Sequence, residues 1–149
     1  MTKATRSSVM AVALLAGCAA MHPPVERTSA KLACDSGREC VVNVDVTCER
    51  FYGCRLAVDH DLVLVMGRGK PTSIVWRLAG ESGARFTSNG IVLDSSDFDC
   101  AAGPETKEFK CTDRHGDFGV FKYRVNVSVP QSPFGPRGVP SLDPWIVND

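Results

Sequence analysis

The middle of the chain alternates apolar and polar residues with the two-residue period of a β-strand. The clearest case is "VFKYRVNVSV", residues 120–129, in which every second side chain from Phe121 to Val129 is apolar and those between them are polar. This alternation predicts an antiparallel strand with one face in the core and the other in solvent. Further strand patterns are found in "CVVNVDVTC", "DLVLVMG", "SIVWRL" and "RFTSNGIVLD".

Turn-forming residues separate these segments. "GRGKPTS" and "AGESGA" are rich in glycine and polar residues, and Asn89-Gly90 predicts a tight turn because apolar residues flank it. No segment has the periodicity of a long amphipathic helix. Short strands at this spacing predict an all-β domain, and we expect an antiparallel β-sandwich with Trp76 in its core.

Six cysteines in the same region indicate that disulfides hold the sandwich together. An even number of cysteines in a small exported domain is typical of such a framework. Six cysteines allow 15 pairings, and we favour the three local ones, although crossed pairs among the first four would close longer loops and stabilise more. The favoured pairs are Cys34 with Cys40, Cys48 with Cys54, and Cys100 with Cys111.

The chain changes character on both sides of the expected domain, which we place at residues 34–130. Residues 131–149 form a Pro/Gly-rich C-terminal tail that we expect to be extended and irregular, because proline cannot donate to a sheet ladder. Its end, "PWIVND", is apolar, and we favour packing on its own domain over a partner-binding motif. Residues 18–33 are polar, include two prolines and predict a tether.

The N-terminus reads "MTKATRSSVMAVALLAGC". Two basic residues precede an apolar run that is too short to span a bilayer, so residues 1–17 predict a cleaved signal peptide. Leu15-Ala16-Gly17-Cys18 resembles the lipobox of bacterial lipoproteins, which implies that the thiol of Cys18 receives a diacylglyceryl group and that Cys18 becomes the N-terminus. The alternative is ordinary signal cleavage, for instance after Ala20.

The strand patterns "IVWRL", "F…NGIVL", "FKYRVNV" and "DPWIVND" resemble those of small bacterial exported proteins with a cupredoxin-like or immunoglobulin-like β-sandwich. The resemblance covers residues 73–149 and implies a fold without an established activity. The immunoglobulin signature is incomplete, because Phe109 stands two residues before Cys111 where a tyrosine would be expected.

Charge and motifs argue against several classes of function. The chain has 17 basic and 17 acidic residues, and loss of residues 1–17 removes two of the basic ones. A mature chain with a net charge near −2 lacks the basic excess typical of nucleic-acid binding. No motif pairs a nucleophile with a base, and only three histidines are present. We therefore expect no catalytic residues and a protein that is not an enzyme.

We also expect no metal or other cofactor, with one alternative. A cupredoxin-like sandwich raises the possibility of copper, for which the candidate ligands are His60, Cys111 and His115; a disulfide at Cys111 would remove the thiolate. "DSSDFDC" contains Asp94, Asp97 and Asp99, but it lacks the glycine and glutamate of an EF-hand. We interpret "DHD", residues 59–61, as solvated charges at a strand edge and "DRHGD" as an exposed hairpin.

Together these features predict a cell-envelope lipoprotein whose non-enzymatic domain binds a protein or another envelope component. The membrane is a partner through the lipid on Cys18, and nucleic acid is not expected to bind. Ala19 follows the anchor cysteine and is not aspartate, which by the sorting rule of lipoproteins implies the outer membrane, facing the periplasm. The alternatives are a copper-binding module and an inhibitor or regulator of an envelope enzyme.

Overall fold

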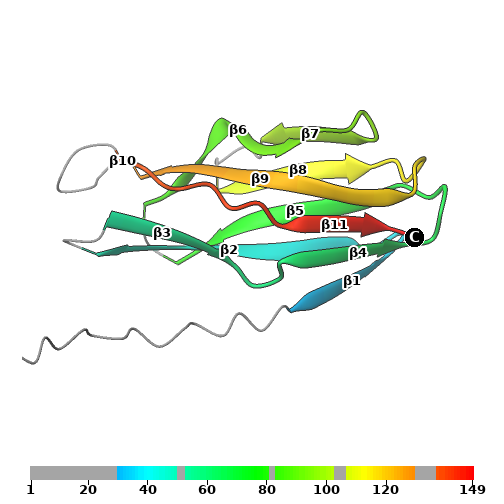
Figure 1. Ribbon diagram of the computed structural model, residues 1–149, viewed down its shortest axis with the longest axis horizontal. Helices are drawn as coiled ribbons and strands as arrows, with labels where there is room; N and C mark the ends of the chain where they lie inside the picture. Colours follow the sequence, from blue (N-terminus) through cyan, green and yellow to red (C-terminus); the bar gives the residue numbers. More distant parts are fainter. Residues whose placement is uncertain (1–29, 50–52, 81–82, 103–106, 130–136) are drawn as a thin grey trace, which may run out of the picture.

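The computed structural model describes residues 30–49, 53–80, 83–102, 107–129 and 137–149, and in them it forms two β-sheets packed face to face (Figure 1). The expected all-β sandwich is confirmed. The signal peptide and most of the tether, including Cys18, lie outside the described residues.

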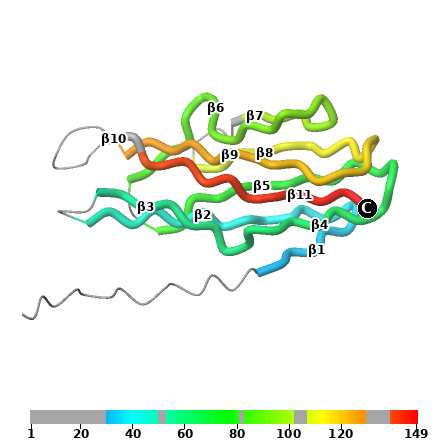
Figure 2. Tube along the Cα trace, viewed as in Figure 1, coloured from blue at the N-terminus to red at the C-terminus, as the bar shows by residue number. Residues whose placement is uncertain are grey.

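The first sheet has six strands. Four follow one another in the order β1-β4-β11-β9, and β9 also pairs with β6 and with the short β10 (Figure 2). The bounds are β1 (Lys31–Asp35), β4 (Leu62–Met66), β6 (Arg85–Leu93), β9 (Gly119–Val129), β10 (Arg137–Gly138) and β11 (Trp145–Asn148).

The second sheet has five strands in the order β3-β2-β5-β8-β7. The bounds are β2 (Glu39–Glu49), β3 (Gly53–Val58), β5 (Thr72–Ala79), β7 (Phe98–Ala102) and β8 (Glu108–Asp113).

The sequence pattern predicts antiparallel sheets, but both sheets are mixed. β1 and β11 run parallel to β4, and β2 runs parallel to β5. Side chains alternate between the two faces in the same way in parallel and antiparallel strands, so the alternation could not predict strand direction. Parallel neighbours need a connection that crosses over. Here the chain makes one by passing from β3 in the second sheet to β4 in the first.

The core lies between the sheets and is centred on two aromatic side chains. Trp76 of β5 and Tyr123 of β9 are 0% and 1% exposed, and their ring centroids are 5.1 Å apart in an edge-to-face arrangement. This geometry is favourable for aromatic pairs. The expected core position of Trp76 is confirmed. The same buried cluster contains valines from β2, β4 and β9, among them Val42, Val44, Val63, Val65 and Val125.

Three disulfides join the pairs favoured from the sequence. Cys48–Cys54 links the neighbouring strands β2 and β3, and Cys100–Cys111 links β7 and β8. Cys34–Cys40 differs from these two, because it connects β1 of the first sheet to β2 of the second. It therefore holds one edge of the sandwich together covalently.

The C-terminal segment is less irregular than the sequence suggests. β11 occupies a central place in the first sheet, between β4 and β9 (Figure 1, red). Its proline, Pro144, precedes the strand, where no ladder N–H is lost, and the carbonyl of Pro144 accepts a hydrogen bond of 3.0 Å from the Tyr123 N–H. Ile146 is completely buried. The preference for packing on its own domain is confirmed for this segment.

Asn89-Gly90 does not form the expected tight turn. Both residues lie inside β6, where the register with β9 shifts between Phe86 and Ile91. Residues 87–90 have no register partner on β9, so Asn89-Gly90 lies in a bulge of β6 between two segments that do pair with β9. Glycine is needed here for another reason: a Cβ on Gly90 would lie 2.7 Å from Cδ2 of Phe109 and 2.8 Å from Cβ of Phe86.

We expect Gly90→Ala to lower the free energy of unfolding by about 1–3 kcal/mol, because the added methyl group overpacks the site between the two phenylalanines. Urea unfolding monitored by circular dichroism measures the change. Gly69→Ala is the control, since its Cβ meets nothing within 4 Å and only the positive φ of 72° opposes it. That variant should lose about 1 kcal/mol or less. Equal stability of Gly90→Ala and the wild type would contradict the packing argument.

Candidate functional site

The three residues proposed as copper ligands do not form a site. The sulfur of Cys111 is bonded to Cys100 and cannot act as a thiolate. His60 precedes β4, whereas His115 contacts Asp149, which follows β11. Because β4 and β11 run parallel and in register, the two histidines lie at opposite ends of this strand pair. Among the described residues, no group of three or more histidines, cysteines or carboxylates is placed to hold a metal ion.

His115 is buried, which corrects the expectation of an exposed hairpin. Its exposed fraction is 1%, and its Nε2 lies 3.0 Å from the backbone oxygen of Asp149. The backbone has a φ of 52°, the left-handed conformation that non-glycine residues adopt in few places. The N–H of His115 donates a 2.8 Å hydrogen bond to Oδ1 of Asp113, which stabilises this turn. The sequence shows "DRHGD" as polar, but it does not show that β11 covers it.

Asp113 forms a buried polar cluster with His115 and Asn148 at this end of the sandwich. Asp113 is 0% exposed, and its Oδ1 also accepts a 3.3 Å hydrogen bond from Nδ2 of Asn148 on β11. Burial raises the pKa of the Asp113 carboxyl above its usual range, and the nearby Asp97 raises it further, while the N–H of His115 opposes the shift. Both residues that donate to Asp113 belong to segments that meet at this end. The cluster therefore fixes the β8–β9 connection against β11.

The aspartates of "DSSDFDC" do not converge on a cation. Asp97 is 8% exposed, and its carboxylate accepts hydrogen bonds of 2.9–3.2 Å from the backbone N–H groups of Gly116 and Asp117. These donors satisfy the oxygens that a calcium ion would need. Asp99 points elsewhere, with a side chain 76% exposed and 4.0 Å from Arg114. Asp97 is therefore a structural group that holds the connection after β8.

The "DHD" segment lies in the connection between β3 and β4 and not in a strand. The Asp59 carboxylate accepts hydrogen bonds from N and Nδ2 of Asn43, at 2.9 and 2.6 Å. Nδ1 of His60 lies 3.0 Å from Oδ1 of Asp59, so the imidazole is next to an acid and is not separated from it as strand alternation would imply. The hydrogen bonds between Asp59 and Asn43 hold the β3–β4 connection against β2.

The outer face of the second sheet is polar and covered with ion pairs. Arg77 of β5 contacts Glu108 of β8 at 2.6 Å and Glu39 of β2 at 3.9 Å, and Lys110 contacts the same Glu39 at 3.8 Å. Val75, which belongs to this outer face by alternation, is only 2% exposed. Long charged side chains cover apolar surface in this way while their charged ends stay in water.

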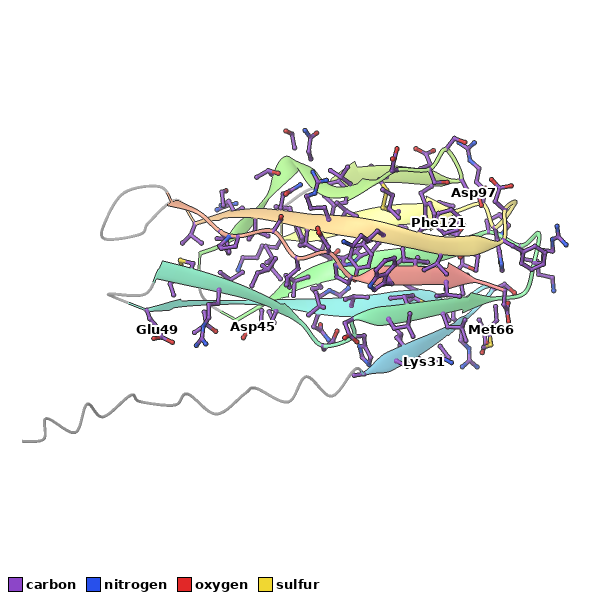
Figure 3. The ribbon with its side chains drawn as sticks, in the orientation of Figure 1. Lys31, Asp45, Glu49, Met66, Asp97 and Phe121 are labelled. Atoms are coloured by element: carbon purple, nitrogen blue, oxygen red, sulfur yellow. A yellow bond between two sulfur atoms is a disulfide. The ribbon has the colours of Figure 1, made fainter. Side chains whose placement is uncertain are left out.

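The outer face of the first sheet has the opposite character. β4 and β11 bury every second side chain in the core, yet the side chains on the other side are apolar as well. Those of β11 stand beside outward residues of β4 and β9 in register. We call this surface the apolar outer face; its residues are Leu62, Leu64, Met66, Val120, Trp145 and Val147. Figure 3 views this sheet from outside, with Met66 labelled on β4.

The sequence contains a signal for this surface. "LVLVM" and "WIV" are apolar at successive positions, and strands that read this way are typically covered on both faces. Val120 and Trp145 are nevertheless 61% and 43% exposed. Because no described segment covers these side chains, the apolar outer face is the strongest candidate for a binding surface in the described part of the chain.

The raised pKa of Asp113 leads to a prediction about pH. A carboxyl with a higher pKa in the folded than in the unfolded chain stabilises the fold fully below its unfolded pKa, and this stabilisation is lost as the pH rises through the folded pKa. Asp113→Asn keeps an Oδ1 acceptor but cannot ionise. Its free energy of unfolding, relative to the wild type, should therefore rise from pH 4 toward pH 8. Urea titrations across this range measure the difference.

Asp99→Asn is the matched control, because that carboxyl is largely exposed and lies outside the buried cluster. The difference between this variant and the wild type should stay nearly flat over the same range. A flat difference for Asp113→Asn as well would show that the buried carboxyl does not control the pH dependence.

The disulfides lead to a second prediction. Alkylation of the folded, non-reduced protein with iodoacetamide should modify none of the six cysteines from Cys34 to Cys111, and mass spectrometry of the peptides should recover the three local pairs. Reduction before alkylation is the control that makes all six available. A free thiol at Cys111 would restore the ligand that a copper site needs.

Comparison with known proteins does not assign the chain to a family. No protein-family model matches it, and no curated protein is similar to it in sequence. Within the described residues, no helix is both long and apolar enough to cross a membrane. The features that bear on its function are therefore those of its own residues: the disulfides, the cysteine outside these pairs, and the apolar outer face.

Proposed function

We propose that the chain is a cell-envelope lipoprotein in which Cys18 carries the lipid and the β-sandwich is a non-enzymatic binding module. The observation that carries this proposal is the division of the seven cysteines. Six of them are paired within the sandwich, which indicates an oxidising, extracytoplasmic compartment. The seventh, Cys18, is the one that lies in the lipobox-like sequence behind a short apolar run.

The binding role is supported by the two outer faces of the sandwich. An exported domain that keeps one face ion-paired and the other apolar has a surface suited to contact with a second body. The partner in this proposal is a protein or another envelope component, and Ala19 after Cys18 favours the outer membrane, facing the periplasm. The parallel strand pairs favour the cupredoxin-like alternative over the immunoglobulin-like one, whose sheets are antiparallel.

The alternatives of the sequence analysis have less support. The copper-binding module loses its thiolate ligand to the Cys100–Cys111 disulfide. No observation on the described residues favours an enzyme inhibitor over other binding proteins.

We expect Cys18→Ser to prevent acylation and either block processing or release the protein from membranes. The membrane-bound fraction of processed protein should fall by about tenfold or more, because the variant has no thiol to receive the two acyl chains that anchor a lipoprotein stably. Fractionation of cells after labelling with radioactive palmitate measures both effects. Ala20→Ser is the control, since it makes a small change beside Cys18 and retains the thiol. Unchanged labelling and fractionation of Cys18→Ser, with normal processing, would contradict the anchor.

A further inference from the structure

The apolar outer face is exposed in a molecule that covers its other outer face with charges. Val120 is 61% exposed and Trp145 43%, and Phe118, two residues before Val120, is 58% exposed. On the opposite face Val75 is 2% exposed among the ion pairs of Arg77, Lys110 and Glu39. Among the described residues, the exposed large apolar side chains belong to strands of the first sheet or, for Phe118, to the connection that leads into β9. An exposed apolar surface of this kind calls for a specific occupant.

The tether ends beside this surface. Residues 19–29 separate Cys18 from the described chain, and β1 begins at Lys31. Lys31 is paired with Leu62 of β4, and Leu62 is paired with Trp145 of β11. With about 4.8 Å between neighbouring strands, Trp145 lies only about 10 Å from the strand on which the tether ends. A bilayer that holds Cys18 is therefore within reach of the apolar outer face.

The chemistry of the surface matches the boundary between lipid and water. Trp145 stands in register between Leu62 and Lys122, and Nζ of Lys122 lies 5.4 Å from the centre of the Trp145 ring. Arg68 covers the ring of Phe118 at 4.1 Å. Tryptophan prefers the level of the lipid headgroups, and lysine and arginine extend their charged ends into water while their stems stay apolar.

Charge contributes less than apolar burial at this surface. Asp143 lies 3.3 Å from Lys122 and 3.9 Å from Arg124, so part of the positive charge beside Trp145 is balanced. A strongly basic surface would indicate selection for anionic lipid. A balanced one indicates contact driven by Trp145, Val120 and their neighbours, with weak dependence on salt.

We propose that the apolar outer face lies on the phospholipid surface of the membrane that holds the lipid of Cys18. This inference rests on the proposed function, because the tether supplies the proximity. A short tether gives the sandwich an effective concentration at the surface in the millimolar range, so a weak contact suffices to hold the domain there. In this orientation the second sheet, with its ion pairs, faces away from the membrane and into the aqueous compartment.

The test uses the mature, acylated protein reconstituted in vesicles of phosphatidylethanolamine and phosphatidylglycerol, with and without brominated acyl chains, which quench tryptophan fluorescence. The chain has two tryptophans, of which Trp76 is fully buried in the core and Trp145 is exposed. Bromine should quench the part of the emission that Trp145→Phe lacks, and the remaining emission of Trp76 should change little. The emission of Trp145 in vesicles should also be blue-shifted relative to its emission in a sample of the protein from which the lipid has been cleaved, measured in buffer without detergent.

A second variant keeps the reporter and changes the surface. Leu64→Ser with Val120→Ser removes two apolar side chains next to β11 and should reduce the quenching of Trp145. Val41→Ser is the matched control, because Val41 is partly exposed on the outer side of the second sheet, and it should quench like the wild type. Circular dichroism confirms that each variant is folded before it is compared.

The outcomes separate this inference from the anchor. Mass spectrometry of the N-terminus reports whether Cys18 is acylated and thus tests the proposed function by itself. If the protein is acylated and held by vesicles but Trp145 is not quenched, the apolar outer face does not lie on lipid and the inference is overturned. A second result would also overturn the inference. If the Trp145 emission shifts as the protein concentration in the vesicles rises, and light scattering gives twice the mass of one chain, the apolar outer face binds a second copy of the chain.

Discussion

The first sheet depends on one strand, β11, which alone joins β4 to β9. β1 pairs with β4 and with no other strand of that sheet, so both strands reach the rest of it through Trp145–Asn148. β11 is separated from β4 by most of the described chain, and loop-closure entropy opposes such pairing until many other contacts exist. Burial of Ile146 against the core favours the pairing. The apolar outer face and the buried polar cluster both exist only where β11 is in place.

The buried polar cluster fixes the register of β11, which apolar packing alone would leave poorly determined. A shift of one residue in the register would turn Trp145 and Val147 inward and Ile146 outward. Because the strand is apolar on both sides, hydrophobic burial discriminates weakly between these arrangements. Asn148 discriminates strongly, since its Nδ2 reaches Oδ1 of Asp113 only when it faces inward, and Nε2 of His115 meets the oxygen of Asp149 in the same register. A buried group left without its partner would be costly.

The sequence predicts the features of this fold that local chemistry determines. Alternation places β2, β5 and β9 and the core position of Trp76, and short spacing favours the three disulfides that the structure has. Long-range pairing decides the rest: the parallel direction of β4 and β11, the central place of β11, and the inclusion of Asn89-Gly90 in β6, where the segments on both sides of this bulge pair with β9. The burial of His115 and the satisfied carboxylate of Asp97 follow from which segments meet at one end, and residue type alone does not reveal this.

The link between Cys34 and Cys40 has a mechanical consequence. A force applied to the chain before β1 acts first on the ladder between β1 and β4, and it can peel only the residues that precede Cys34. At that point the load passes through a covalent bond to Cys40, at the start of β2, and from there to the parallel neighbour β5. Tension on the tether is thus carried by the second sheet once the residues of β1 before Cys34 have separated from β4.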